Sequence, residues 1–391
     1  MIKQTKGIWR KVKLGEWIEL KYGFGLPEEK RIKGDIPVYG SSGIVGFHNE
    51  PAVYTKGIII GRKGNVGAVY FSDKPFYPID TVYFIDSLKK DGYLKFFYYL
   101  LKIIDFKKVD INVGVPGLNR ETAHSLEFII PEDPNEQKRI ADILSAFDDK
   151  IEVNNKIIKT LETMAQEVFK EWFVRFRFPG WEKVKFVDSE LGKIPEGWEV
   201  KFLSEVFDFL EGPGIRNWQY TTSGCRFINI RLIQDNDIDI KSANFISTEE
   251  ANGKYKHFHL QERDMIVSTS GTLGRSAIVR KEHLPLLLNT SVIRFRPKDK
   301  KNYGFMYQFL NSIYFQNKIL SMASGSAQPN FGPVHLKQIK LVVPNKDILN
   351  LFSTLIDPVY EKIIILKSEN QKLAAIRDLL LTKLMRGEIR I

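Results

Sequence analysis

A heptad pattern from Asp133 to Trp172 is the sequence feature that most constrains the fold. Its apolar positions are separated by alternating steps of four and three residues, with one polar member, Asn154, and they are Ile140, Leu144, Phe147, Ile151, Ile158, Leu161, Ala165, Val168 and Trp172. A 3.5-residue period sustained over several heptads is typical of a coiled-coil seam. The alternative, a long core helix buried all round, fits poorly with faces so rich in Lys, Glu and Asp.

Helix-start residues stand at the beginning of this segment. Asp133 is a good N-cap, Pro134 fits the first helical position, and Glu136 stands where a capping-box acid reaches back. The sequence therefore predicts a long helix that begins here and needs a partner for its seam.

A second segment, from Asn345 to Met385, provides that partner. Pro358 should kink it or mark its true start, with Asp357 as N-cap. At about 1.5 Å per residue each helix would span roughly 50 Å. We expect two long antiparallel helices, and the second has Asn370 in its seam together with Phe352, Leu355, Val359, Ile363, Leu366, Leu373, Leu380 and Leu384.

The seam residues Asn154 and Asn370 have two interpretations. A buried polar residue in a seam can fix the pairing register at a cost in stability. Alternatively, these side chains face solvent where the seam opens.

The remaining sequence consists of two copies of one module, each followed by one of the long helices. The order of the matching residues is preserved, with only small shifts in offset. The matched pairs are Trp9 and Trp198, Gly23 and Gly212, Gly25 and Gly214, Gly64 and Gly271, Gly67 and Gly274, the dipeptides Asp80-Thr81 and Asn289-Thr290, and the closing prolines Pro131 and Pro344. This pattern indicates a tandem duplication.

Each module is predicted to contain short strands between Gly and Pro turns, and one aromatic-rich helix. The expected helices are 93–106 and 303–319, and the expected strands are 57–60, 68–71, 81–85, 226–230, 265–268, 277–279 and 291–295. The predicted fold class is α+β, with two tandem mixed α/β domains separated by two long antiparallel coiled-coil helices. The predicted domains are 1–132 (first module), 133–175 (first long helix), 176–344 (linker and second module) and 345–391 (second long helix).

Charge and cysteine usage narrow the function class. The net charge of +11 favours a polyanionic partner, nucleic acid before membrane, although a generally basic proteome would give the same value. Cys225 is the single cysteine, which excludes an intrachain disulfide and fits a reducing cytoplasm. No apolar run approaches membrane-spanning length. His257 and His259 lack a third ligand in pattern, so we interpret them as strand residues and expect no metal site.

Catalytic motifs are missing from the sequence. Glu136-Gln137-Lys138 has the E-x-K form of a nuclease core, but it opens a helix instead of ending a strand. The loop at 22–25, Tyr-Gly-Phe-Gly, is superficially like the glycine loop of adenosylmethionine-dependent enzymes, but no acidic residue follows at the right distance on a βαβ pattern. No P-loop occurs either. The chain is therefore not expected to be an enzyme.

The two glycine loops, 61–67 and 271–274, are candidate DNA-binding elements. Arg and Asn read guanine and adenine edges, while Ser, Thr and Lys also bind phosphates. Glycine with positive φ also builds such turns, so a purely structural role is the alternative. The candidates are Tyr22, Arg31, Lys33, Ser41, Ser42, Arg62, Lys63, Asn65 and Arg120 in the first module, and Arg216, Asn217, Arg231, Lys254, Lys256, Ser268, Thr269, Ser270, Thr272, Arg275, Gln328 and Asn330 in the second.

Over nearly its whole length the chain resembles the specificity (S) subunit of type I restriction-modification systems. The resemblance depends on the entry to the first helix, where Pro131, Glu136-Gln137 and Ile140 are similar to that family's P-x-x-E-Q-x-x-I pattern. The pattern continues at 148–151, 154–155 and 161–162. The second copy departs from it, since Asn345-Lys346-Asp347 replaces the Glu-Gln entry.

The resemblance implies two target-recognition domains, each reading one half of a bipartite, asymmetric DNA sequence. It also implies that the paired helices fix the spacer and dock two modification (methyltransferase) subunits, which restriction subunits join. No cofactor is then expected in this chain, and S-adenosylmethionine would bind the methyltransferase subunit. A free-standing DNA-binding or architectural protein is the alternative. Apolar residues outside the seam favour docked subunits, and the docking candidates are Ile143, Ile157, Met164, Phe169, Ile364, Ile365 and Leu379.

Overall fold

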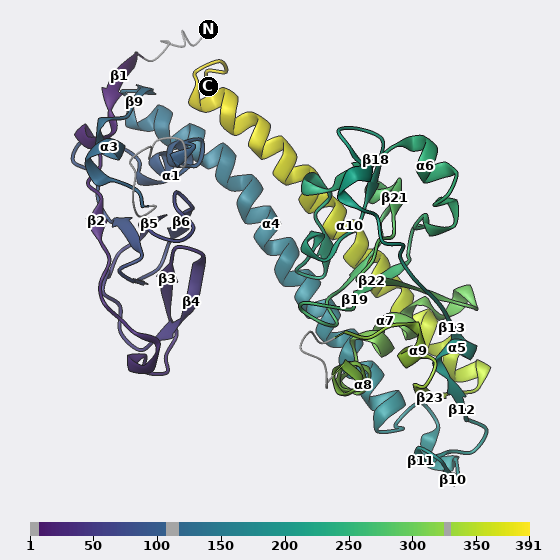
Figure 1. Ribbon diagram of the computed structural model, residues 1–391. Helices are drawn as coiled ribbons and strands as arrows, with labels where there is room; N and C mark the ends of the chain where they lie inside the picture. Colours follow the sequence, from purple (N-terminus) through teal and green to yellow (C-terminus); the bar gives the residue numbers. More distant parts are fainter. Residues whose placement is uncertain (1–7, 107–116, 324–329) are drawn as a thin grey trace, which may run out of the picture. The chain divides into compact units, whose positions relative to one another are not determined.

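The computed structural model describes residues 8–106, 117–323 and 330–391 (Figure 1). The chain divides into two compact units, which we call unit 1 (Met1–Val153 with Asn370–Ile391) and unit 2 (Asn154–Glu369). Two long helices run through both units, α4 at Pro134–Phe169 and α10 at Lys346–Met385. The predicted fold class, two mixed α/β domains with two long helices, is confirmed.

Unit 1 is built on one four-stranded antiparallel sheet, with α1 (Leu94–Lys102) against its edge (Figure 1). The order is β2-β8-β5-β6, with bounds Lys21–Tyr22, Val82–Ile85, Gly57–Gly61 and Val69–Ser72. The other elements are the sheet β4-β3-β7 (Gly43–His48, Ile36–Gly40, Tyr77–Pro78), the pair β1-β9 (Trp9–Lys13, Glu127–Pro131) and α3 (Arg120–Ser125).

Unit 2 has the corresponding sheet β13-β22-β19-β20, at Phe207–Glu211, Val292–Pro297, Met265–Ser268 and Ser276–Ile278. A second sheet, β14-β18-β15-β21, comprises Tyr220–Thr221, Asn244–Ile246, Cys225–Phe227 and Leu286–Leu287. Paired strands are β12-β23 (Glu199–Phe202, Lys340–Val343), β10-β11 (Phe186–Ser189, Gly192–Pro195) and β16-β17 (Ile233–Gln234, Asp237–Ile238). The helices are α5 (Leu203–Val206), α6 (Thr248–Asn252), α7 (Tyr303–Asn311), α8 (Ile313–Ala323) and α9 (Pro333–Leu336).

The duplication is visible in the backbone hydrogen bonds of the two glycine loops. The Gly67 N–H donates to the Gly61 carbonyl at 2.9 Å, and the Gly274 N–H donates to the Ser268 carbonyl at 3.0 Å. Gly67 and Gly274 have φ values of 79° and 76°, a region that disfavours residues with a Cβ. The glycines therefore build the same turn twice.

One predicted match between the modules is wrong by one residue. The Arg62 N–H donates to the Thr81 carbonyl, and its counterpart, the Thr269 N–H, donates to the Ser291 carbonyl, both at 2.9 Å. Thr81 therefore corresponds to Ser291, so that Asp80-Thr81 matches 290–291 and not 289–290. The sequence match followed residue type, whereas strand pairing sets the register.

Two further predictions about local structure need correction. The helix predicted at 303–319 is two helices, because Ser312 has extended backbone and its Oγ accepts the Phe315 N–H at 3.2 Å. His257 lies in a short 3-10 helix, Lys256–Phe258, rather than in a strand, and His259 contributes only an isolated bridge to Leu287.

The start of α4 is fixed to the first module by buried polar side chains. Asp133 acts as N-cap, since its Oδ1 accepts the Asn135 N–H at 2.9 Å. Glu136 accepts the Trp9 indole N–H at 2.9 Å. Gln137, fully buried, accepts the Tyr93 N–H and donates to the Pro131 carbonyl, both at 2.9 Å. The Glu-Gln pair of the sequence motif thus fastens the helix to the module.

The start of α10 differs from the prediction. Asn345 caps it by accepting the Ile348 N–H at 3.0 Å, so the helix begins well before Pro358. Asp357 is therefore not an N-cap, and its carboxylate accepts the Gly304 N–H. Pro358 is tolerated inside the helix because it is exposed, where water can hydrate the carbonyl that loses its partner.

The two helices are antiparallel in each unit. In unit 1 the Arg377 guanidinium is 2.5 Å from the Asp148 carboxylate. In unit 2 the Asn154 amide donates to Glu369 at 2.9 Å, while toward the other end of α4 the Phe169 ring lies 6.2 Å from that of Phe352.

Two seam predictions are resolved by these contacts. Asn154 is fully buried, which excludes the solvent-facing interpretation for this residue. Leu355, predicted in the seam, is 49% exposed because Phe352 and Ile356 take the buried positions on that stretch of α10.

His283 should make the stability of unit 2 sensitive to acid. Its imidazole is fully buried beside the Arg280 guanidinium, and burial first, then Arg280, lowers its pKa to about 4. Because the unfolded chain binds this proton near pH 6.5 and the native state does not, stability is lost as the pH falls below 6.5. We expect this residue alone to cost about 2 kcal/mol by pH 5.

The check is urea unfolding at pH 7 and pH 5, with His283→Gln and, as a control, the exposed His257→Gln. The loss of stability between the two pH values should shrink in the first variant and stay unchanged in the second. Equal losses in all three proteins would show that His283 is not the titrating group.

Candidate nucleic-acid interface

Two arginines and two tyrosines form a cluster that includes Arg62 of the first module's glycine loop. The Arg62 and Arg120 guanidiniums lie 5.2 Å and 5.5 Å from the centre of the Tyr22 ring, which packs edge-on against Tyr83 at 5.0 Å. The residues come from the β5–β6 loop, the start of α3, and strands β2 and β8. We call these four residues the Arg–Tyr cluster.

Polar contacts hold the geometry of this cluster, at the surface for Arg62 and in the interior for Tyr83. Arg62 donates from Nε and Nη2 to the Asp80 carbonyl at 3.3 and 2.9 Å. The buried Tyr83 hydroxyl donates to the Leu118 carbonyl at 3.1 Å, and its pKa is raised to about 12, mainly by burial. Tyr22 is half exposed. The cluster therefore presents an aromatic face and fixed cations, which can stack on bases or donate to base edges and phosphates.

The other first-module candidates lie nearby or hold local structure. Ser41 accepts the Asn65 N–H at 3.4 Å, which ties two predicted residues together. Arg31 donates to the Val45 carbonyl at 2.8 Å and so braces the β3–β4 hairpin. The exposed candidates are Lys33, Ser42, Lys63 and Asn65.

Two second-module candidates are wrong. Ser268 and Thr269 are fully buried, so neither can meet DNA from the surface. Ser268 Oγ donates to the Thr272 carbonyl at 2.6 Å and accepts the Arg275 N–H at 2.9 Å, which closes the glycine turn. Ser270 is partly exposed, and the exposed candidates at this edge are Thr272, Arg275 and Asn330. Gln328 lies outside the described residues.

Elsewhere in the second module the candidates are exposed but scattered. Arg231 donates to the Ser242 carbonyl at 3.3 Å and to the Asn244 side chain at 3.1 Å. Lys254 lies over the Tyr255 ring at 5.1 Å. The exposed candidates that remain are Arg216, Asn217 and Lys256.

Sequence reasoning missed two residues of the second module. Trp218, next to Arg216 and Asn217, is 80% exposed, and a lone Trp in a polar loop was the available signal. Glu211 corresponds to Tyr22 at the offset of the first matched glycines. It is partly buried, which raises its pKa, and within the described residues it makes no hydrogen bond or ion pair.

Most of the docking candidates on the long helices are exposed, but one is not. Phe169 is 5% exposed and packs against Phe173, Phe305 and Phe352, because α7 also covers this end of α4. It is therefore wrong as a docking residue. Ile364 is partly buried, and the exposed candidates are Ile143, Ile157, Met164, Ile365 and Leu379.

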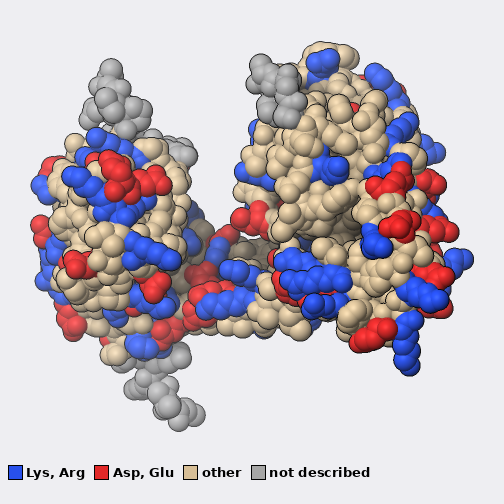
Figure 2. Space-filling view, turned by 90° about the horizontal axis from the view of Figure 1, so that it is seen from below, with Lys and Arg blue, Asp and Glu red and all other residues tan. Residues whose placement is uncertain are grey.

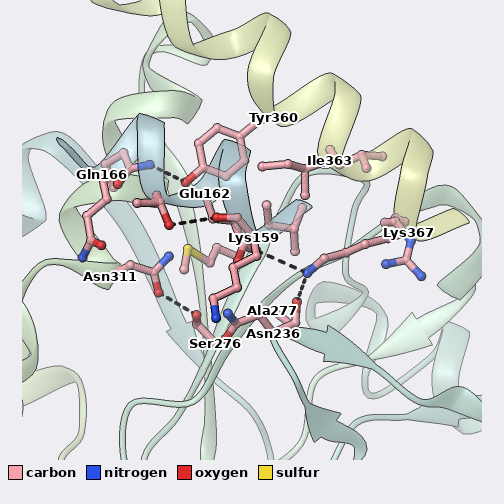
Figure 3. Close-up of a pocket in the computed structure, with 16 residues that line it drawn as sticks. Lys159, Glu162, Gln166, Asn236, Ser276, Ala277, Asn311, Tyr360, Ile363 and Lys367 are labelled. Atoms are coloured by element: carbon pink, nitrogen blue, oxygen red, sulfur yellow. Dashed lines mark hydrogen bonds and ion pairs between the residues drawn. The ribbon is translucent and has the colours of Figure 1, made fainter. Parts of the chain in front are cut away.

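A polar cavity of about 320 Å³ lies in unit 2 between α4, α10 and the second module (Figure 3). Lys367 reaches into it from α10, donating to the Asn236 carbonyl at 2.7 Å and lying 3.8 Å from Glu162 of α4. Burial lowers the pKa of this lysine. These contacts join the two long helices to the second module.

The side of the molecule displayed in Figure 2 carries no patch of a single charge sign. Figure 2 shows Lys and Arg mixed with Asp and Glu on the side that it displays.

Residues 8–106, 117–323 and 330–391 contain no group of three or more His, Cys, Asp or Glu placed to hold a metal ion. No helix in these ranges has the length and apolarity needed to cross a membrane.

Comparison with known proteins identifies the family. The model of the type I restriction modification DNA specificity domain matches residues 7–163 and 195–375, so that each copy includes a module and part of its helix. Because this covers most of the chain, the protein belongs to the specificity-subunit family of type I restriction-modification systems.

Relatives of similar length support this assignment. The type I restriction enzyme MjaIX specificity subunit of Methanocaldococcus jannaschii is 29% identical over 87% of this chain and 79% of its own length. The HindI specificity subunit of Haemophilus influenzae is 26% identical over 84% and 85%. The crystal structure of a type I S subunit from M. genitalium has the same fold, with a TM-score of 0.61, 19% identity and 98% coverage of both chains.

Proposed function

We propose that this chain is the DNA sequence-recognition subunit of a type I restriction-modification complex. Each module reads one half of a bipartite, asymmetric DNA target through the edge that carries its glycine loop. The observation that carries this proposal is the Arg–Tyr cluster, in which Arg62, on a turn that the second module repeats, and Arg120, at the start of α3, flank the half-exposed Tyr22.

The cluster is suited to DNA because its donors are already oriented. Arg62 donates two N–H groups to the Asp80 carbonyl, and its remaining N–H groups can donate to a ligand. A guanidinium in fixed geometry can donate to the O6 and N7 acceptors of guanine, or to phosphate. A fixed side chain also loses less conformational entropy on binding.

The long helices serve, in this proposal, to set the spacer between the half-sites and to dock two modification (methyltransferase) subunits. The exposed apolar residues Ile143, Met164, Ile365 and Leu379 support docking, since exposed apolar side chains can supply the core of a protein–protein interface. Catalysis is assigned to the partners: S-adenosylmethionine binds the methyltransferase subunit and not this chain, and restriction subunits join that complex.

Replacing Arg62 by Ala should weaken DNA binding by the complex of this chain with its methyltransferase subunit by about 1–3 kcal/mol. The readout is fluorescence anisotropy with target DNA at several salt concentrations. A base contact lowers affinity and relaxes sequence preference, whereas a phosphate contact lowers affinity for all sequences and reduces the salt slope.

The matched control is Arg10→Ala, an exposed arginine of the same module that makes a surface ion pair with Glu132 at 3.4 Å. It should bind DNA as the unmodified chain does. Unchanged affinity and preference in the Arg62 variant would remove the cluster from the interface.

A further inference from the structure

The strand ladders place Tyr22 and Glu211 at the same position of the repeated fold. Tyr22 pairs with Tyr83 across β2 and β8, and Glu211 pairs with Ile293 across β13 and β22. The next N–H in each strand, that of Gly23 or Gly212, donates to the carbonyl of the equivalent valine, at 3.1 Å and 3.4 Å. A tyrosine in one module is thus replaced by a carboxylate in the other.

The arginines of the Arg–Tyr cluster also have defined counterparts. The Leu118 N–H donates to the Arg62 carbonyl at 2.9 Å, and the Phe331 N–H donates to the Thr269 carbonyl at 3.3 Å. Arg62 therefore corresponds to Thr269. Counting two residues onward from Leu118 and from Phe331 makes Arg120 the counterpart of Pro333. The second module therefore has no cation at the positions of Arg62 and Arg120, where it has Thr269 and Pro333.

Among the residues that the structure describes, two polar groups at this place in the second module have no partner. The Glu211 carboxylate is partly buried and makes no hydrogen bond or ion pair within the described residues. The Thr269 hydroxyl is fully buried and likewise has no hydrogen-bond partner there. Leaving such a group unsatisfied is costly, and a ligand that donates to Glu211, which unlike Thr269 is partly exposed, recovers the cost.

We infer that Glu211 is a specificity-determining residue that accepts a hydrogen bond from an exocyclic amino group of a base, while the first module presents arginine donors at the equivalent place. The two half-sites are then read with opposite hydrogen-bonding polarity from one shared backbone frame. This inference rests on the proposed function.

DNA chemistry favours an amino group over other ligands for Glu211. A carboxylate repels phosphates, so this residue is unsuited to the backbone contacts that fix position. In the major groove, the N4 amino group of cytosine and the N6 amino group of adenine are donors that a carboxylate can accept. In the first module, by contrast, Arg62 and Arg120 match the acceptors of guanine.

The test is selection of bound sequences from a randomised DNA library by the complex of this chain with its methyltransferase subunit. Glu211→Gln keeps the shape but adds a donor and removes the charge. We expect this variant to lose roughly 10- to 100-fold discrimination at one base pair of one half-site, with the other half-site unchanged. Arg62→Lys should alter only the opposite half-site.

Glu199→Gln is the control, because Glu199 is an exposed glutamate of the same module that pairs with Lys201 at the surface. Glu211→Asp, which retains the carboxylate, should keep the same preferred base and guards against a folding defect in the Gln variant. If Glu211→Gln selects the same bipartite sequence as the unmodified chain, the inference fails and the proposed function stands. If the unmodified complex selects no bipartite sequence, the proposed function itself fails.

Discussion

Replacing Phe352 by Ala is expected to lower the free energy of unfolding of unit 2 by about 3–5 kcal/mol. Phe352 is fully buried on α10, and its ring centre lies 4.7 Å from that of Phe173 and 5.6 Å from that of Trp172. Trp172 and Phe173 come from the π-helical turn Lys170–Val174 that follows α4, and their rings already pack on one another. They therefore cannot close over the space that the lost Phe352 ring leaves. The helix pair should therefore loosen where it meets the second module.

The measurement is the urea dependence of hydrogen exchange in peptides from α7, which reports on unit 2 separately from unit 1. Leu355→Ala is the matched control, since Leu355 lies on the same stretch of α10 with 49% of its surface exposed. It should change stability by less than about 0.5 kcal/mol. Equal effects of the two substitutions would contradict the packing described for this junction.

Replacing Asp264 by Ala should destabilise unit 2 to a similar degree, by about 3–5 kcal/mol. Asp264 is fully buried and accepts two hydrogen bonds from Arg296, at 2.6 and 2.7 Å, as well as the Gln261 N–H at 2.7 Å. Removing the carboxylate leaves a guanidinium that is largely withdrawn from water without its counter-ion. Loss of one partner of such a pair costs more than the pair itself contributes.

The same exchange measurement can follow this variant, with Glu262→Ala as the control, because Glu262 is an exposed carboxylate two residues away. The control should leave the urea midpoint of the α7 peptides unchanged. If Asp264→Ala also leaves it unchanged, the Asp264–Arg296 pair contributes little to the second module.

The long helices and the duplication could be predicted from sequence because both are local or periodic signals. The heptad series predicted α4, and the equal spacing of glycines in the two modules predicted the turns at Gly67 and Gly274. The start of α10 could not be predicted as well, because proline usually ends or kinks a helix. Pro358 instead lies inside α10, where its exposed position lets water hydrate the carbonyl that loses its partner.

What the sequence could not supply was the tertiary environment of individual side chains. Phe169 lies outside the heptad series but is buried, because Phe305 of the second module covers it. Ser268 and Thr269 have residue types that suit DNA binding, but they lie beneath the glycine turn. The importance of Glu211 depends on the absence of a partner among the described residues, and this is a property of the fold rather than of the residue type.

The central claim is that this chain supplies sequence specificity to a methyltransferase. The most direct measurement is to co-express it with the methyltransferase subunit of its own system and to map adenine methylation across a genome, with and without this chain. The account predicts methylation at one bipartite motif with a fixed spacer, lost when this chain is omitted. Unchanged methylation without the chain, or no methylation and no co-purifying methyltransferase, would contradict it and leave a free-standing DNA-binding protein.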